Sequence, residues 1–475
     1  MERVSVLVYQ YLPYNKHIRL FKNENTLGGK MMLINFEFKN HLSYRDDTVF
    51  SMETGKRLRK LKENTYEVQK TRHTEKINLL KSAIVFGANG SGKSNLISAL
   101  KLMQELILSE NMSATKKIPK VSFLLDDYPV ENSTKLCVEI VANGIQYQYQ
   151  YQFEYVETAI LRETLFYYEN GKYYKYFERD EEAFIVTPKW VKDEVTKTRR
   201  NELFLKVGQS VNDTHCLNVY RWFSNQLVFI NGHIEHRDIK EMLHVIENEE
   251  SKRDLIEFLQ KCDIKVADID TTIDTFNIPK QLLNILNAIN NENEEVMNTS
   301  EAELKTDVYK LNLVYKKYNQ EGDRIGSQRI SFNHESEGTK KLITLALNIL
   351  DETKRGSVFV MDEFDDSLHL NLSKIMIKLF NLMENRSQFV LTSHQLFLLD
   401  CDLRVDQIYL AKKDFEGASE LYSIFDFNDD YGKRSDLTIF KRYLEGVYGA
   451  VPNVTINDFT TLIGKKHHVD GGEDE

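Results

Sequence analysis

Eight consecutive residues, from Gly87 to Ser94, have the types and spacing that hold a phosphate chain. They read GANGSGKS and match the pattern GxxxxGK[ST]. Glycines in such a loop let backbone N–H groups turn toward a β-phosphate, and the following helix adds its dipole. Lys93 would reach the β- and γ-phosphates, and the Ser94 hydroxyl would bind Mg²⁺. The sequence therefore predicts an ATP site, with the binding residues Gly87, Asn89, Gly90, Ser91, Gly92, Lys93, Ser94 and Asn95.

Two adjacent carboxylates follow a second apolar run. Residues 357–361 read SVFVM and lead into Asp362 and Glu363. An apolar strand that ends in acidic residues is common, but its position downstream of a phosphate-binding loop gives it a specific meaning. Asp362 would hold Mg²⁺ through water, and Glu363 would polarise the attacking water. We therefore predict Ser94 and Asp362 as metal ligands and Glu363 as a catalytic residue.

A third apolar run, QFVLTS at 388–393, ends in His394, which lies 31 residues after Glu363. A histidine at this place can contact a γ-phosphate and sense its loss. A lone histidine at a strand end is usually only a polar terminus. The spacing favours the switch role, and we predict His394 as the second catalytic residue.

Ser336, Glu337 and Gly338 precede an amphipathic helix with Leu342, Leu345, Ala346 and Ile349 on one face. Two interpretations are open. Ser336 is a good N-cap residue, and local features alone favour that role. The order of the other motifs favours a loop in which the Ser336 hydroxyl and the backbone at Gly338 approach a phosphate.

These motifs need elements that position them. Residues 82–86 (SAIVF) predict a strand, and Leu96, Leu100, Met103 and Ile107 recur at spacings of 4, 3 and 4, which predicts a helix directly after the loop. Phe359 to Met361 and Phe389 to Leu391 are continuous apolar runs, typical of strands buried on both faces. The expected fold class is α/β.

The middle of the chain has a different pattern. Residues 145–155 alternate strictly, and Asn143-Gly144 and Asn170-Gly171 each stand between two β-favouring runs. Because both positions of a tight hairpin turn need positive φ, Asn-Gly is a strong hairpin signal. Residues 234–320 look mainly helical. The acidic DIDTTIDT stretch (Asp268, Asp270 and Asp274) could mimic a metal site, but a polar loop is the better interpretation.

Six segments are expected from these patterns. They are an N-terminal extension (1–30), the first part of an ATPase lobe (31–125), a β-rich subdomain (126–230), a helical insertion (231–329), the second part of the lobe (330–455) and a tail (456–475).

Composition limits the classes of protein. The 475 residues carry a formal charge of −10, which weighs against strong nonspecific binding of nucleic acid. We find no run of 18 apolar residues and no secretory signal, so neither a membrane span nor export is expected. The four cysteines are far apart and form no CxxC pair, and a reducing cytoplasm fits best.

The order of the motifs resembles the ABC-type ATPases, in the branch with SMC-, RecF- and OLD-like proteins. More narrowly, the chain resembles the AAA-type ATP-binding proteins of abortive phage infection (the RloA-like group). The resemblance covers about residues 31–455, and the segments that carry it are NFEFKNHLSYRD, VSFLLDD at 121–127, FNHESEGTKKL at 332–342, VMDEFDDSLHLNL at 360–372, LTSHQLFLLD at 391–400 and RYLEGVYGAVPNV at 442–454.

The resemblance implies an ABC-type P-loop ATPase fold and further assignments. Residues 335–339 stand where these proteins carry the signature loop, which closes over ATP bound to the other subunit. Residues 366–369 would lie at the subunit contact. ATP binding would then form a homodimer or a higher homo-oligomer. No Q-loop glutamine can be placed, because Gln104 lies within the helix after the phosphate loop.

Two functions from different classes follow. The first is a defence ATPase that controls a separate effector protein, a nuclease or toxin. The second is a RecF- or SMC-like repair or recombination ATPase, for which nucleic acid is the partner. A transporter subunit is disfavoured, because the β-rich insertion is unlike a transporter's helical domain.

Overall fold

A computed structural model describes most of residues 31–451, together with Thr460. The gaps are 57, 59, 70–75, 110–112, 128–131, 143–147, 170–171, 182, 190, 192–197, 231–235, 278–304, 355, 428–437 and 452–459. The expected N-terminal extension (1–30) and nearly all of the expected tail (456–475) therefore lie outside the described residues.

The chain divides into two compact units, which we describe separately. The core unit comprises Lys30–Phe229 and Gly356–Glu475, and the inserted unit comprises Met1–Gly29 and Ile230–Arg355. Both catalytic candidates and the phosphate loop belong to the core unit. The predicted signature loop belongs to the inserted unit.

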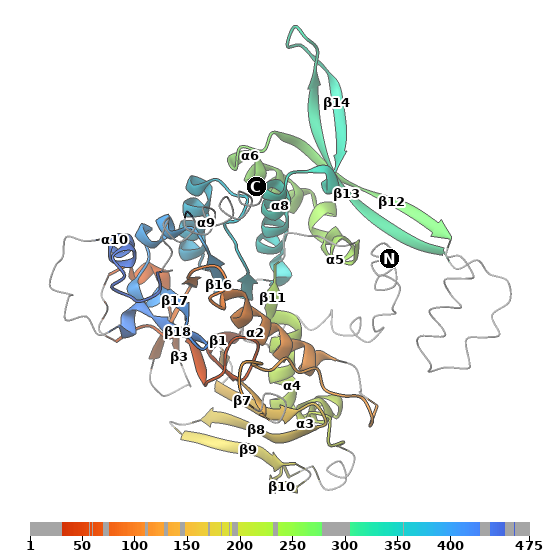
Figure 1. The fold of residues 1–475 in the computed structure, drawn as a ribbon. Coiled ribbons are helices and arrows are strands. Elements are labelled where there is room, and N and C mark those ends of the chain that lie inside the picture. Colours follow the sequence, from red (N-terminus) through yellow and green to blue (C-terminus); the bar gives the residue numbers. More distant parts are fainter. Residues whose placement is uncertain are drawn as a thin grey trace, which may run out of the picture. The chain divides into compact units, whose positions relative to one another are not determined.

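A mainly parallel sheet forms one layer of the core unit (Figure 1). Its strand order is β11-β15-β16-β5-β17-β18, and only the β17–β18 pair is antiparallel. Every residue of β5, β15 and β16 is buried, as their continuous apolar sequences predict. The strands are β5 (Ser82–Phe86), β11 (Leu227–Phe229), β15 (Val358–Met361), β16 (Gln388–Ser393), β17 (Ile408–Lys413) and β18 (Ser419–Ser423).

An antiparallel sheet forms the second layer, in the order β10-β9-β8-β7-β6-β1-β2. The strands on either side of both Asn-Gly pairs are paired, Val141 with Gln148 and Glu169 with Lys172, while the predicted turns themselves lie outside the described residues. The strands are β1 (Met31–Lys39), β2 (Thr48–Ser51), β6 (Thr134–Ala142), β7 (Gln148–Val156), β8 (Ala159–Glu169), β9 (Lys172–Asp180) and β10 (Ala183–Val186). Because β6 pairs with β1, this sheet combines the expected first part of the ATPase lobe (31–125) with the expected β-rich subdomain (126–230).

Helix α2 (Lys93–Leu108) lies in the core shared by the two sheets. Leu96, Leu100, Met103 and Ile107, which the sequence pattern placed on one face, are all buried there. A side chain also joins the layers directly. The Gln388 carboxamide of β16 accepts from the Leu33 backbone N–H (2.7 Å) and donates to the Leu33 carbonyl (3.1 Å), at an irregularity in β1. Strand β16, which pairs with the strand that leads into the phosphate loop, is thus held against the second sheet.

Smaller elements complete the core unit. They are the hairpin of β3 (Thr65–Gln69) and β4 (Lys76–Leu80), and the helices α3 (Phe204–Ser210), α4 (Thr214–Arg221), α9 (Leu370–Leu382) and α10 (Ile439–Leu444).

The inserted unit corrects the expectation of a mainly helical segment at 231–329. Its first part is helical, with α5 (His236–Glu247) and α6 (Glu249–Lys261), and α8 (Glu337–Leu350) closes the unit. Between them lies a three-stranded antiparallel sheet of β12 (Val266–Asn277), β13 (Lys305–Tyr318) and β14 (Arg324–Ser331). The acidic run of β12 and the polar residues of β14 hid two of these strands, whereas β13 does alternate, with Leu311 and Leu313 buried.

The acidic stretch in β12 is likewise a strand and not a loop. Each of its three carboxylates has a cationic partner: Asp268 pairs with Lys252 (2.8 Å), Asp270 with Arg329 (2.5 Å) and Asp274 with Lys310 (2.5 Å). These acids are spread along the strand and balanced by cations, which argues against a shared metal ion.

The fold class is confirmed as α/β with antiparallel sheets. None of the helices in the described part of the chain is long and apolar enough to cross a membrane.

Candidate nucleotide site

Three of the predicted motifs meet at one edge of the parallel sheet. Strands β15, β16 and β5 are neighbours and run parallel, so their carboxyl ends lie at the same edge (Figure 1). Met361 is beside Leu391, and Ser393 is beside Phe86. The phosphate loop, the Asp362–Glu363 pair and His394 begin directly after these strand ends. In open α/β sheets, ligands bind at such an edge.

The phosphate loop has a backbone that its glycines make possible. Gly92 has φ of 107°, and a Cβ there would lie 2.4 Å from the Ser419 Oγ. A Cβ on Gly87 would lie 2.3 Å from the Ala411 carbonyl oxygen. Side chains at these positions would therefore collide with β17 and β18 neighbours. The glycines let the loop pack against the sheet while its own face stays open.

Lys93 is folded back over the loop. It is 4% exposed, and its Nζ donates to the carbonyls of Gly87 (2.8 Å) and Ala88 (2.9 Å). Burial lowers the pKa of Lys93 to about 8, an effect that the nearby carboxylates of Asp362, Glu363 and Asp365 partly oppose. An ammonium held this way has poor solvation, and a bound polyphosphate would give it a better partner.

The carboxylate pair is positioned by a residue that the sequence analysis missed. The Thr392 hydroxyl donates to Asp362 Oδ1 at 2.5 Å and accepts from the Glu363 backbone N–H at 2.7 Å. Thr392 lies on β16, two residues before His394. The pairing register explains the contact: Met361 pairs with Leu391, so the next residues, Asp362 and Thr392, are also neighbours.

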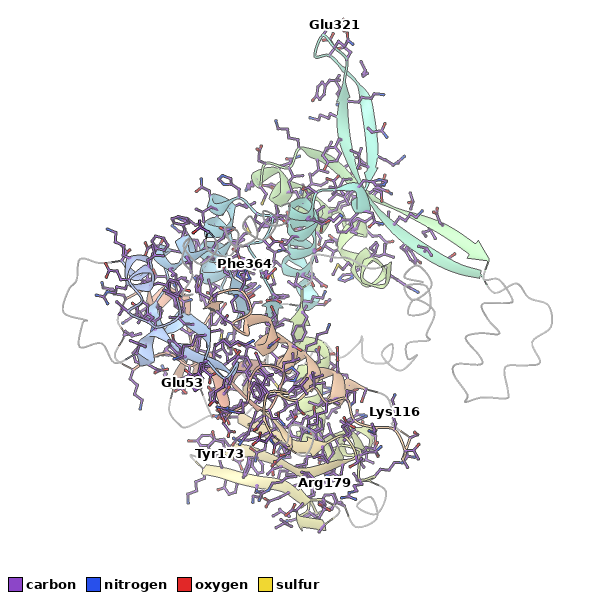
Figure 2. The ribbon with its side chains drawn as sticks, viewed as in Figure 1. Glu53, Lys116, Tyr173, Arg179, Glu321 and Phe364 are labelled. Carbon is purple, nitrogen blue, oxygen red and sulfur yellow. The ribbon has the colours of Figure 1, made fainter. Side chains whose placement is uncertain are left out.

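Glu363 and His394 are in direct contact. The His394 Nε2 lies 2.9 Å from Glu363 Oε1, and both side chains are partly exposed. Glu363 also has φ of 46°, which is uncommon for a residue with a side chain. Backbone in this region costs free energy and clusters at functional sites. The structure thus brings the two predicted catalytic residues together. Glu363 directly precedes Phe364, which is labelled in Figure 2.

The other predicted phosphate-site residues differ in their surroundings. Asn89, Gly90 and Ser94 are exposed, whereas Ser91 is buried and its hydroxyl has no hydrogen-bond partner among the described residues. Asn95 faces elsewhere: its side-chain amide donates to the Ser43 Oγ at 2.7 Å. Asn95 therefore supports the loop between β1 and β2, and its predicted contact with nucleotide has no geometric support here.

Gln104 has a structural role, in agreement with its rejection as a Q-loop residue. Its side-chain amide donates to the backbone carbonyls of Phe223 (2.7 Å) and Leu227 (2.8 Å). The amide therefore fixes helix α2 to the start of β11.

The predicted signature residues begin α8 in the inserted unit. Ser336 is the N-cap, and its Oγ accepts from the Thr339 backbone N–H at 3.2 Å. Glu337 pairs with Lys340 at 2.8 Å, and Ser336 and Glu337 are exposed. Ser336 therefore caps α8, as the first interpretation predicts. The start of the helix is exposed and accessible to a ligand.

Comparison of the sequence with known protein families assigns the chain to one of them. Residues 82–204 and 237–400 match the family described as "AAA domain, putative AbiEii toxin, Type IV TA system". These residues are more than half of the chain, so the protein belongs to this AAA-domain family. The matched residues include the phosphate loop, Ser336, the Asp362–Glu363 pair and His394.

Solved structures with a similar arrangement include heads of SMC proteins. The SMC head domain from Thermotoga maritima has 15% sequence identity and a TM-score of 0.34, covering 82% of this chain and 98% of that one. An Smc head domain with an extended coiled coil, bound to the C-terminal domain of ScpA derived from Pyrococcus furiosus, has 12% identity and a TM-score of 0.34, covering 88% and 100%. An SmcHead bound to the C-winged helix domain of ScpA has 10% identity and a TM-score of 0.37, covering 87% and 99%. No curated protein matches the chain in sequence.

Proposed function

We propose that this protein binds and hydrolyses ATP and acts as a nucleotide-dependent switch. The observation that supports this most directly is the meeting of three strand ends. A glycine-rich loop with a buried lysine, an aspartate held by Thr392 and a glutamate bonded to His394 lie at one sheet edge. Few chemistries other than phosphoryl transfer from a nucleotide use this set of groups.

The residues present fit a nucleotide and its metal ion. Within the described part of the chain the buried Ser91 hydroxyl has no partner, and a Cβ on Gly90 would meet nothing within 4 Å. Ser94 and Asp362 are both exposed oxygen donors, the type that Mg²⁺ prefers. When bound, Mg²⁺ would neutralise charge on the β- and γ-phosphates.

Each side chain has a defined task in the proposal. Lys93 exchanges its two loop carbonyls for phosphate oxygens. Thr392 fixes Asp362 and the backbone of Glu363. Glu363 orients and polarises the attacking water, and His394 holds the glutamate's carboxylate in place. As the γ-phosphate leaves, the partners of His394 change, which makes it a candidate sensor.

Two copies of the chain complete the proposed site. Ser336, Glu337 and Gly338 of one copy would meet ATP bound to the other, so that two helix N-termini face the triphosphate from opposite sides. ATP binding would favour the dimer, and hydrolysis would release it.

The family description supports a role in defence. It refers to a putative AbiEii toxin and a type IV toxin–antitoxin system, in agreement with the resemblance to abortive-infection proteins. We therefore infer a cytoplasmic ATPase of the RloA-like group whose ATP state controls a separate effector. This is favoured over a RecF- or SMC-like repair role, because the likeness to SMC heads is one of fold alone.

Phosphate release from MgATP tests the enzymatic part of the proposal. Glu363→Gln should lower turnover by about 10²- to 10⁴-fold, the usual contribution of a general base. ATP binding should remain. Glu384→Gln, the same change at an exposed carboxylate of the core unit, is the matched control. Equal turnover in wild type and Glu363→Gln would refute the assigned role.

A further inference from the structure

A two-stranded ribbon extends from the inserted unit. We define it as residues 316–329, the end of β13 and most of β14 (Figure 1). Strand β12 pairs with β13 only as far as Tyr315, so beyond that residue the described part of β13 pairs with β14 alone. Every ribbon residue except Asn319 is exposed. Figure 2 labels Glu321 at the tip.

The ribbon is too exposed to be explained by packing within the chain. Isolated two-stranded hairpins are marginally stable in water and bury little apolar surface. Tyr318 and Ile325 are 54% and 55% exposed. An element that buries almost no surface against the described residues of its unit is best explained by contact with another molecule.

Its charges distinguish it from the rest of the chain. Lys316, Lys317 and Arg324 form no ion pair with any described residue, although the neighbouring carboxylates of β12 are all paired. The chain as a whole has a formal charge of −10. Exposed cations without an ion-pair partner among the described residues attract anions, and we take this cluster on an acidic protein as a local site for a polyanion.

The cations are present on both faces of the ribbon. Lys316 pairs with Ser327 and Lys317 with Gly326, and successive residues of a strand point to opposite faces. Arg324 pairs with Tyr318, the residue after Lys317, across an irregularity in the register, and therefore lies on the face opposite Lys317. A Cβ on Gly326, the cross-strand neighbour of Lys317, would meet nothing within 4 Å, so the surface beside Lys317 is open.

Two carboxylates, Glu321 and Asp323, lie in the turn and not on the paired strands before it. Asn319 closes this turn, because its Oδ1 accepts from the Asp323 backbone N–H at 2.7 Å. The acidic tip limits how far the ribbon can enter an anionic groove. The cationic part is the body of the ribbon.

We propose that this ribbon is a binding site for duplex DNA, with its body in the major groove. A major groove of B-DNA admits a two-stranded β-ribbon and has a phosphate ridge on each side. Cations on both faces of the ribbon match the two ridges, whereas a ribbon that lay flat on one backbone would need them on one face. Tyr318 and Ile325 supply apolar surface at the level of the bases.

The ribbon is continuous with the start of α8. Strand β14 ends at Ser331, five residues before Ser336, and the Tyr315 hydroxyl at the ribbon's base donates to Glu335 Oε1 at 3.0 Å. Occupancy of the ribbon would therefore act on Glu335, the first residue of the predicted signature loop. The DNA site itself does not depend on the proposed ATPase activity.

Fluorescence anisotropy with a labelled 20-base-pair DNA duplex and nucleotide-free full-length protein tests the site. The variant Lys316→Glu/Lys317→Glu/Arg324→Glu should bind at least about tenfold more weakly at 0.1 M salt. The slope of log K against log salt should fall by about two to three, since each lost phosphate contact removes about 0.9. The control carries the same charge change elsewhere: Lys172→Glu/Lys374→Glu/Lys378→Glu, three exposed lysines of the core unit.

Two further arms keep the outcome unambiguous. Replacing residues 317–326 by Asn-Gly joins Lys316 to Ser327, its paired residue, in a tight turn, and should also abolish specific binding. Duplex RNA of the same sequence should bind more weakly, because its major groove is narrow and deep. Unchanged affinity in the ribbon variants, an equal loss in the control variant, equal binding of RNA, or no binding of DNA by the wild type would each overturn the proposal.

Discussion

The sheet edge of the core unit and the ribbon of the inserted unit use polar residues in opposite ways. At the sheet edge, Lys93, Asp362 and Glu363 each have partners within the chain, and the strands beneath them are fully buried. On the ribbon, Lys316, Lys317 and Arg324 are exposed and form no ion pair with a described residue. The first arrangement fixes geometry before a ligand arrives. The second leaves cations free to meet a partner.

This difference separates chemistry from recognition. A reacting group must be held within a fraction of an ångström, which requires a rigid support and supporting hydrogen bonds. A phosphate backbone needs only charges at the right spacing, and an exposed strand pair can supply them. We therefore expect substitutions of buried polar groups in the core unit to have larger effects than comparable substitutions of exposed groups.

The largest effect is expected at a buried ion pair of the core unit. Glu163 and Arg179 are both fully buried and 2.8 Å apart, and the same carboxylate accepts from the backbone N–H groups of Phe204 and Leu205 (Figure 2 labels Arg179). Glu163→Gln leaves the Arg179 charge without compensation and should cost about 3–5 kcal/mol. Urea unfolding followed by the fluorescence of buried Trp222 measures this.

An exposed pair in the same unit provides the control. Glu67 and Lys76 lie 2.6 Å apart with both side chains more than half exposed. Glu67→Gln should therefore cost under about 1 kcal/mol. If the two substitutions had equal effects, the distinction between buried and exposed polar groups would fail for this protein.

Removal of the phosphate-loop lysine comes next. Lys93→Ala should weaken ATP binding by on the order of 100-fold, because it removes charge-assisted hydrogen bonds to phosphate from a buried site. Isothermal titration with MgATP gives the affinity. Lys101→Ala, an exposed lysine on the same helix, should leave it within about twofold. Retained affinity in Lys93→Ala would place the nucleotide elsewhere.

The pKa of Lys93 sets a pH dependence. Without nucleotide, burial holds this pKa at about 8, and a bound phosphate restores the charged form. Above pH 8, the protein must therefore take up a proton to bind ATP, and affinity should fall by up to about tenfold per pH unit. Titrations at pH 7, 8 and 9 in two buffers of different ionisation enthalpy detect the uptake. Constant affinity over this range would contradict the assignment.

The smallest effect on stability is expected at Ser336, where the two interpretations of that residue can be separated. Asparagine and aspartate cap helices about as well as serine, so Ser336→Asn and Ser336→Asp should change stability by less than about 0.5 kcal/mol. If Ser336 meets ATP bound to a second copy, only the aspartate should block the ATP-dependent dimer, through repulsion of phosphate. Identical dimerisation of both variants would leave the cap as its whole role.

Local sequence patterns predicted the elements around the site well. The SAIVF strand, the helix after the loop and the Asn-Gly hairpins depend on neighbouring residues, so short segments were enough to recognise them. The contact between Glu363 and His394 was harder to predict from the sequence, because it depends on the order of the strands in the sheet. The 31-residue spacing suggested that both residues belong to one site but did not show that they touch.

Other features could not be read from the sequence. The pairing of β1 with β6 and the role of Thr392 arise from contacts distant along the chain. Strand β12 was misread because its carboxylates make it look like a loop, although each is neutralised by a cation from another element. The contact of Asn95 with Ser43 could not be read from the sequence either, because a motif position does not reveal a partner distant along the chain.

The mass of Glu363→Gln in solution tests the central claim most directly. Light scattering after size exclusion should give twice the 55.6 kDa of one chain with MgATP and a smaller mass without nucleotide, because ATP that cannot be hydrolysed holds two copies together. The Lys93→Ala/Glu363→Gln double variant should not respond to ATP. A mass of one chain for Glu363→Gln, unchanged by ATP at concentrations that saturate binding, would contradict a nucleotide switch built from two copies.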